Sequence, residues 1–198
     1  MAIHHLLYAC VECGREAGIK ETEAGEVCDR CGARYSRADG AAIRVEPANG
    51  PPVIKQPAEW LDVLSRGGIL DRKPSKPEPV IVRLAIGARP YRHSGVYLGE
   101  VEYFGEPVTG VLELSDESIV FKPAEGAEVV WPLHELTAVQ PSSTTLQLKI
   151  RRGPVVSLRF PEGSPLLWEE RVRNAVQAWY TKADRGEIAE FQPRIVCR

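Results

Sequence analysis

The chain has 198 residues, of which 43% are hydrophobic and 26% are charged, an ordinary composition for a globular protein with room for one domain and a small module. Its formal net charge of −2 excludes a strong overall basic field that would draw it to nucleic acid or anionic lipid. No apolar run in the sequence approaches the roughly 20 residues that a membrane-spanning helix needs.

Two Cys-x-x-Cys pairs lie near the N-terminus, Cys10 with Cys13 and Cys28 with Cys31, and a glycine follows each pair directly. Two intervening residues let both thiolates of a tight turn reach one ion, and two such turns supply the four sulfurs of tetrahedral Zn²⁺. Glycine takes positive φ at little cost, which suits the sharp bend after each pair. The pattern predicts a zinc ribbon over residues 1–46, with one structural Zn²⁺ bound by these four cysteines.

Other uses of the cysteines fit less well. The N-terminal sequence has neither the basic region nor the long apolar run of a signal peptide, so we expect a cytoplasmic protein without a disulfide framework. Iron in the same four-sulfur site remains an alternative, because the ligand type does not separate it from zinc. The fifth cysteine, Cys197, lies far along the chain and is expected to be a spectator thiol. Four cysteine ligands leave no open coordination position, and the sequence contains none of the common catalytic motifs, so we expect no enzymatic activity.

A linker with a short helix is predicted to follow the ribbon over residues 47–79. Pro57 can occupy the first turn of a helix over 57–66, Trp60 and Leu64 share its apolar face, and two glycines stop it. About ten residues do not form a stable helix alone. We therefore expect this helix to dock on the larger domain.

From Val80 to the C-terminus the pattern predicts a larger, mainly β domain over residues 80–198. Apolar residues alternate with polar ones in successive short segments, a period typical of half-buried strands. The expected strands cover residues 80–86, 95–104, 108–114, 118–121, 127–131, 136–139, 145–150 and 155–160. A polar loop is expected over 89–94, and a bulge at Gly99.

The period changes to that of an amphipathic helix over residues 165–183. Ser164 is a suitable N-cap, and Pro165 suits the first helical position. Five apolar residues fall on one stripe that requires a sheet face or a barrel mouth to cover it. They are Trp168, Val172, Ala175, Val176 and Trp179.

The series of strands followed by one helix resembles the pleckstrin-homology (PH) fold, and its local sequence is similar to that of GRAM-type members of this fold. The matching segments are 109–116, 118–121, 131–133 and 136–139, within a resemblance that covers residues 95–182. It implies a module that binds phospholipid headgroups, peptides or other domains, and it leaves residues 80–88 as an added edge strand. The expected fold class is therefore α+β, mainly β: a small four-cysteine zinc ribbon followed by a PH-like antiparallel β-barrel or sandwich with a C-terminal α-helix as its cap.

One basic cluster is a candidate site for an anionic ligand: Lys149, Arg151, Arg152 and Arg159. Outward basic residues of this kind more often form a solvated surface than a ligand site. As a headgroup site they would supply about 1 kcal/mol each near an anionic bilayer, which gives roughly millimolar affinity. Membrane contact through this cluster would then be weak and peripheral, and recruitment would need avidity or a protein partner.

Three functions are compatible with these patterns. The first is a non-enzymatic cytoplasmic adaptor, in which the ribbon accompanies a PH/GRAM-like domain that binds a protein or a lipid headgroup. The second is an accessory factor of membrane lipid metabolism. The third, a nucleic-acid-associated zinc-ribbon protein, is disfavoured because acidic residues slightly outnumber basic ones in residues 1–50.

Overall fold

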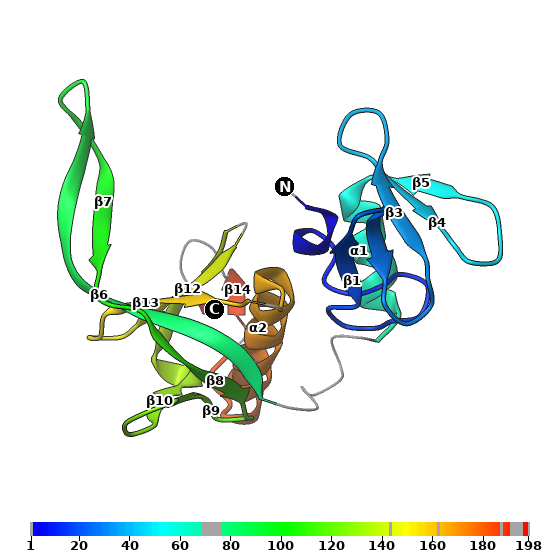
Figure 1. Ribbon diagram of the computed structural model, residues 1–198. Coiled ribbons are helices and arrows are strands. Elements are labelled where there is room, and N and C mark those ends of the chain that lie inside the picture. The colour runs from blue at the N-terminus through cyan, green and yellow to red at the C-terminus, as the bar shows by residue number, and fades with distance from the viewer. Residues whose placement is uncertain are drawn as a thin grey trace.

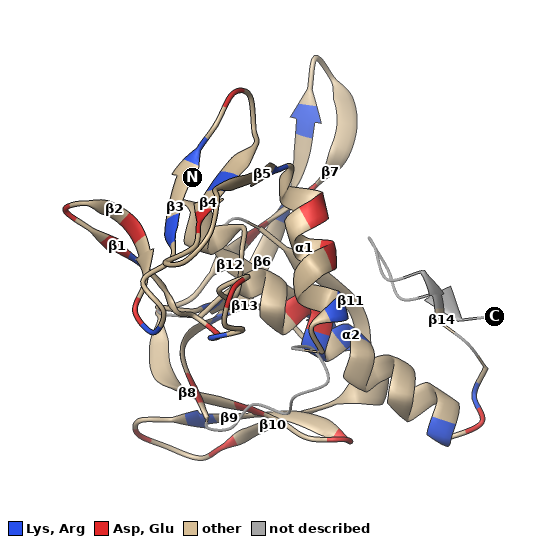
Figure 2. Cartoon of the chain, turned by 90° about the vertical axis from the view of Figure 1, so that its right-hand side faces the viewer, with Lys and Arg blue, Asp and Glu red and all other residues tan. Residues whose placement is uncertain are grey.

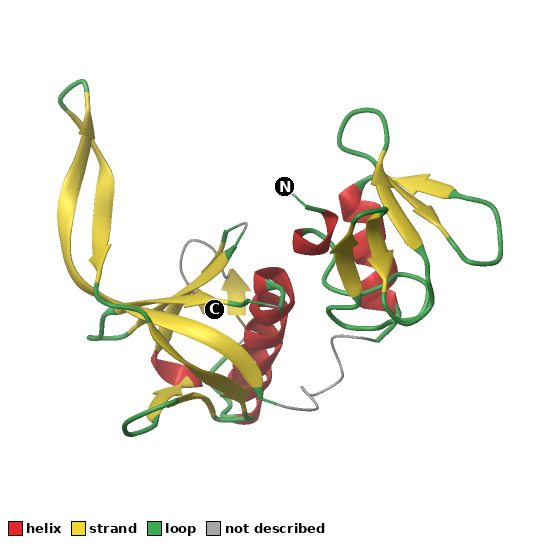
Figure 3. Cartoon of the chain, viewed as in Figure 1, coloured by secondary structure: helices red, strands yellow, loops and turns green. Residues whose placement is uncertain are grey.

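The structure is a computed structural model that describes residues 2–68, 77–142, 144–161, 163–186, 188–190 and 196–197. Figure 1 shows an N-terminal part and a larger C-terminal part, and Figure 3 shows that strands dominate both. Each part has its own cluster of buried apolar residues. Among the described residues, no helix has both the length and the apolar character needed to cross a membrane.

The N-terminal part is a five-stranded antiparallel sheet in the order β1-β2-β3-β4-β5. A short 3₁₀ helix, η1 (Ile3–His5), precedes the sheet. The strands are β1 (Ile19–Thr22), β2 (Gly25–Cys28), β3 (Arg34–Arg37), β4 (Ile43–Glu46) and β5 (Val53–Lys55). β5 lies in the segment expected to be a linker, and by pairing with β4 it extends the ribbon sheet instead.

The short helix α1 (Pro57–Arg66) begins and ends where the sequence predicts. Gln56 and Glu59 form a reciprocal capping box at its N-terminus, which satisfies backbone donors that the first turn leaves free. The expectation that α1 docks on the larger domain is wrong. Trp60 and Leu64 are buried in the N-terminal cluster, and Trp60 Nε1 donates a hydrogen bond of 3.0 Å to the carbonyl oxygen of Ile43 in β4. An amphipathic helix buries its stripe on the nearest free apolar face, which here is the ribbon sheet.

The larger part contains an eight-stranded antiparallel sheet in the order β10-β9-β8-β6-β13-β12-β11, with β7 paired to β6 off this path. Its strands are β6 (Glu78–His93), β7 (Val96–Phe104), β8 (Val108–Leu114), β9 (Ser118–Pro123), β10 (Val129–Pro132), β11 (Leu136–Pro141), β12 (Thr145–Ile150) and β13 (Val155–Arg159). A 3₁₀ helix, η2 (Leu133–Glu135), joins β10 to β11. The expected strands are all present, and all except β6 lie within a few residues of their predicted bounds.

Strand β6 differs from its prediction in place and in length. It is central rather than an added edge strand, because residues 78–82 pair with β8 and residues 81–84 pair with β13. It also continues through residues 89–92, where a polar loop was expected, and pairs there with β7. Pro90 is tolerated because β13 no longer pairs with this half of β6, so one strand edge needs no backbone donor. The ladder is irregular opposite Gly99, where a bulge was expected.

The C-terminal helix α2 (Pro165–Lys182) packs against the larger sheet as predicted. Ser164 caps it by accepting a hydrogen bond from the N–H of Leu167. Trp168, Val172 and Val176 are fully buried, and the Trp168 ring stacks on Phe160 with centroids 5.5 Å apart. A small two-stranded sheet follows the helix, made of β14 (Ile188–Glu190) and β15 (Val196–Cys197).

The first turns of α2 also contact the N-terminal part, an arrangement the sequence did not predict. Leu167 is buried in the N-terminal cluster rather than in that of the larger sheet. Arg171 Nη2 lies 2.8 Å from a carboxylate oxygen of Glu16, and the Arg171 side chain is only 3% exposed. Helix α2 therefore packs against both parts of the molecule, with Leu167 and Arg171 toward the N-terminal part and Trp168, Val172 and Val176 in the core of the larger part.

Candidate metal centre

The two cysteine turns have the same local structure. The N–H of Gly14 donates to the carbonyl oxygen of Cys10 at 2.8 Å, and the N–H of Gly32 donates to that of Cys28 at 3.0 Å. Both glycines have positive φ, 66° and 74° respectively. A side chain would strain the backbone in this conformation, so the glycine after each pair is required by the turn.

These turns bring the four sulfurs together. The Sγ atoms of Cys10 and Cys31 are 3.5 Å apart, those of Cys13 and Cys28 are 3.7 Å apart, and all four lie within 4.8 Å of one another. With Zn–S bonds of about 2.3 Å, a tetrahedral site separates its sulfurs by about 3.8 Å. The donor set therefore fits one tetrahedral metal ion, and both turns contribute two of its ligands.

The same distances are far from those of disulfides. A disulfide needs its sulfurs about 2.05 Å apart, so the 3.5 Å between Cys10 and Cys31 is no covalent bond. All four thiols are free. The side chain of Cys197 lies outside the described residues.

Burial differs among the four cysteines and affects their chemistry. Cys10 is 0% exposed and Cys28 is 2% exposed, whereas Cys13 and Cys31 are partly exposed. Burial, reinforced by the neighbouring sulfurs, raises the pKa of the Cys31 thiol to about 12. A bound cation would make four thiolates compatible at such short separations, because metal binding displaces the protons.

Tyr35 on β3 is a further part of this centre that the sequence analysis missed. Its hydroxyl donates a hydrogen bond of 3.0 Å to Cys10 Sγ and accepts one of 3.1 Å from the N–H of Val11. The residue is 4% exposed, and burial together with Cys10 raises the pKa of its hydroxyl well above the usual range. The available signal was an isolated aromatic residue four positions after the last cysteine, which by itself is equally typical of core packing.

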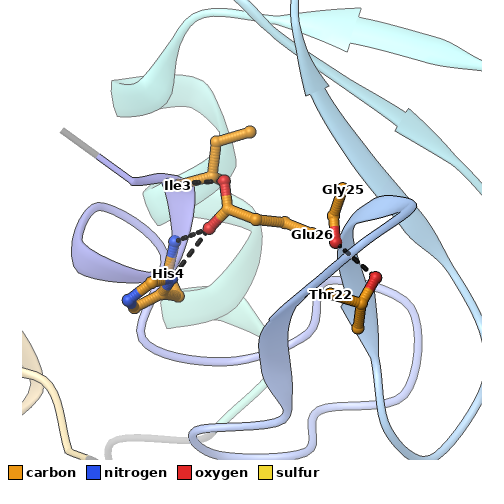
Figure 4. A network of polar contacts seen from close by, with 5 residues as sticks. All are labelled: Ile3, His4, Thr22, Gly25 and Glu26. Atoms are coloured by element: carbon orange, nitrogen blue, oxygen red, sulfur yellow. Dashed lines mark hydrogen bonds and ion pairs between the residues drawn. The ribbon is translucent and has the colours of Figure 1, made fainter.

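Glu26 on β2 attaches the N-terminus to the ribbon, as Figure 4 shows. Its carboxylate accepts hydrogen bonds from the N–H groups of Ile3 at 2.8 Å and His4 at 3.0 Å, and it lies 2.8 Å from His4 Nδ1. In the neighbouring turn, Thr22 Oγ1 donates to the carbonyl oxygen of Gly25. Burial alone would raise the pKa of Glu26, but the His4 and Ile3 contacts outweigh it and lower that pKa.

The four basic candidate residues do not gather in one place. Lys149 is at the end of β12 and its Nζ donates to the carbonyl oxygen of Gly153, while Arg151 and Arg152 lie in the turn that follows. Arg159 pairs with Thr145, at the opposite end of the same hairpin, about 13 Å along the strand from Lys149. Arg151 Nε also lies 3.7 Å from a carboxylate oxygen of Glu135. Only Lys149, Arg151 and Arg152 are therefore close enough to act on one ligand.

Comparisons with known proteins add no family to these observations. A scan of protein-family models gives no match to the chain, and a search of curated proteins gives no match either. The resemblance of residues 95–182 to PH and GRAM domains thus rests on sequence pattern alone. Inference about function starts from the four-cysteine centre and the surfaces around it.

Proposed function

We propose that this protein is a non-enzymatic cytoplasmic adaptor, in which a structural zinc ribbon supports a PH/GRAM-like domain that binds a protein or an anionic headgroup. The observation that carries the proposal is the set of four cysteine sulfurs within 4.8 Å of one another. Four sulfur ligands complete a tetrahedral shell and leave no position for substrate or water. Thiolate ligands need a reducing compartment, which supports the cytoplasmic assignment.

Zinc is assigned to the centre on chemical grounds, because four sulfurs alone suit iron as well. Zinc has no redox role and suits a centre whose purpose is to hold a small sheet together. The ribbon strands have three or four residues each, and a sheet of such short strands needs stabilisation beyond its own packing. Metal binding supplies it, because the free energy of binding contributes to the free energy of folding.

The PH-like assignment of the larger domain is supported by the order of its elements. Its large sheet is antiparallel and contains two runs of consecutively paired strands, β8-β9-β10 and β11-β12-β13, and one amphipathic helix with a buried tryptophan packs against it. A fold of this kind serves many functions, so the ligand must be argued from a site. Figure 2 shows basic and acidic residues distributed over both parts of the chain. The candidate headgroup site is the basic turn that contains Arg151 and Arg152.

Cobalt substitution tests whether the centre is structural or catalytic. The Co²⁺-loaded full chain should show the intense visible bands of a tetrahedral thiolate site, and added azide or imidazole should leave them unchanged. A spectrum that shifts on addition of either ligand would reveal an open coordination position and contradict the proposal.

Vesicle sedimentation tests the headgroup function. Binding of the full chain to anionic vesicles should be weak and should fall as salt rises, because exposed charges act over only about 8 Å at physiological ionic strength. The pair Arg151→Glu and Arg152→Glu should abolish it, whereas Arg34→Glu and Arg37→Glu on β3 should reduce it far less. If both double variants sediment with anionic vesicles to the same extent as wild type, this turn is excluded as the headgroup site. Protein binding would then remain as the adaptor's function.

A further inference from the structure

The distal half of the β6–β7 hairpin, residues 84–104, forms an arm that extends away from the larger sheet (Figure 1). Along the arm β7 pairs only with β6, and β6 has no described partner except β7 beyond Leu84. Both outer strand edges are therefore free among the described residues. An isolated two-stranded ribbon is marginally stable in water, so an arm of this length gains from a covering surface.

The arm carries an unusual share of exposed apolar side chains. Of the thirteen large hydrophobic residues that are exposed in the described chain, eight lie in these 21 residues. They are Leu84, Ile86, Tyr91, Val96, Tyr97, Leu98, Val101 and Tyr103, with exposures from 39% to 75%. Single exposed apolar residues are normal, but a continuous set is typical of an interaction surface.

The amount of this surface fits a protein interface. Tyr91, Tyr97 and Tyr103 are each about half exposed. On a scale of about 150–250 Å² per aromatic side chain, with aliphatic ones somewhat smaller, the eight residues present roughly 700 Å² of apolar area. A standard stable interface buries about 800 Å² on each partner. Because these residues are divided between the two faces of the ribbon, the arm supplies nearly one partner's share only when both of its faces are covered.

The charges of the arm select the kind of partner. Its two arginines, Arg89 and Arg92, lie on β6, and its two glutamates, Glu100 and Glu102, lie on β7. The arm is thus neutral, which gives nucleic acid or an anionic bilayer no electrostatic attraction to it. Two copies related by a two-fold axis that runs along the arms would place β6 of each over β7 of the other, which brings the basic strand of each near the acidic strand of its partner.

The strand register separates the arm into two faces. Arg89 pairs with Val101, and two residues away on the same face are Tyr91 and Tyr103. The Arg89 guanidinium lies over the Tyr103 ring, 5.7 Å from its centroid. Apolar groups therefore extend from the base of the arm to its tip instead of gathering at the tip, as a membrane-inserting hairpin would require.

We propose that this protein forms a two-fold symmetric dimer in which the β6–β7 arms of two copies pack against each other. A two-fold interface uses the same patch on both copies, so it must be self-complementary in charge and apolar on both sides. The neutral, apolar arm meets both conditions. The proposal does not depend on the identity of the metal or on headgroup binding.

Sedimentation velocity on the metal-loaded full chain tests the dimer. The wild type should sediment at about twice the chain mass of 21.9 kDa at micromolar concentration. Leu98→Glu and, separately, Val101→Glu should each raise the dimer dissociation constant at least about tenfold, because each leaves an unpaired carboxylate in the interface. Val129→Glu, at a similarly exposed valine on β10, is the matched control and should leave the dimer unchanged.

Thermal unfolding of each variant checks that the arm substitutions have not unfolded the domain. Wild type that sediments at 21.9 kDa up to about 100 µM overturns the proposal, since a standard interface gives far tighter binding. A dimer that survives both arm substitutions also overturns it. Binding of a monomeric wild type to neutral vesicles through the arm would assign the surface to a membrane instead.

Discussion

At the scale of single residues, the Tyr35 hydroxyl is the group outside the four cysteines that acts most directly on the metal centre. It donates to Cys10 Sγ and is held in place by the Val11 N–H. Hydrogen bonds from outer groups fix metal ligands in orientation, and their loss typically costs 10–100-fold in metal affinity. Tyr35→Phe should therefore release zinc to a chelator about tenfold faster than wild type, as measured by stopped-flow absorbance.

A matched control for this variant is Tyr103→Phe, which changes a half-exposed tyrosine on β7 in the same way. It should release zinc at the wild-type rate. If Tyr35→Phe also releases zinc at the wild-type rate, its hydrogen bond to Cys10 does not stabilise the centre.

Glu26 predicts a pH dependence in the ribbon. The pKa of Glu26 is below its ordinary value of 4.5 in the folded state, so the unfolded chain binds its proton more readily. Its stabilisation is therefore complete above pH 4.5 and is lost as the pH falls through the folded pKa. Glu26→Gln should lower the free energy of unfolding by about 1–2 kcal/mol at pH 7, because hydrogen bonds to a charged group are lost.

Urea unfolding of wild type and Glu26→Gln at pH 7, 6, 5 and 4 measures the difference between their free energies of unfolding. Metal release in acid affects wild type and variant alike, so the difference between them isolates Glu26. It should be constant from pH 7 to 5 and should narrow below. A difference that is the same at every pH would show that the Glu26 charge has no role.

At the scale of elements, helix α2 is the main support of the larger sheet. Trp168 is 0% exposed and stacks on Phe160, the residue directly after β13. Replacing a buried tryptophan with alanine typically costs about 3–5 kcal/mol, a large share of the roughly 5–15 kcal/mol that stabilises a domain. Trp168→Ala should lose that amount in urea unfolding, whereas Asn174→Ala on the exposed side of α2 should change stability by less than about 0.5 kcal/mol. A loss below about 1 kcal/mol for Trp168→Ala would contradict the packing described for α2.

The elements that sequence could predict are those set by local periodicity and local chemistry. The alternation of Leu146, Leu148 and Ile150 predicts β12, and Ser164 with Pro165 predicts the start of α2. The spacing of the cysteines likewise predicts the metal ligands, because two residues between them suffice to bring two sulfurs to one point. These features depend on residues that are close in the sequence.

The features that sequence could not predict depend on contacts between distant residues. Pro90 and the polar residues around it indicate a loop, yet strand β6 continues there because β7 pairs with it. Tyr35 becomes part of the metal centre only after β3 folds back over Cys10. The docking of α1 on the ribbon is set by which apolar face is nearest, and helix periodicity does not specify a partner.

At the scale of the whole molecule, the Arg171–Glu16 pair joins α2 to the N-terminal part across 155 positions of sequence. A nearly buried arginine that loses its acid partner is left as an uncompensated charge. Glu16→Ala and Arg171→Ala should therefore be strongly non-additive, with a coupling energy of about 0.5–3 kcal/mol in a double-mutant cycle. Additive effects within about 0.3 kcal/mol would show that this pair does not couple the two parts.

The central claim is that four cysteines hold one structural zinc ion, and metal analysis of two purified proteins tests it most directly. Elemental analysis of wild type should find about one zinc per chain, and Cys28→Ser should lose it and leave residues 1–46 sensitive to protease while the larger sheet stays folded. The reason is that the ribbon strands have only three or four residues each, whereas structural zinc supplies about 10–16 kcal/mol in small peptides at pH 7. Iron in place of zinc in wild type, or full metal retention in Cys28→Ser, would contradict the account.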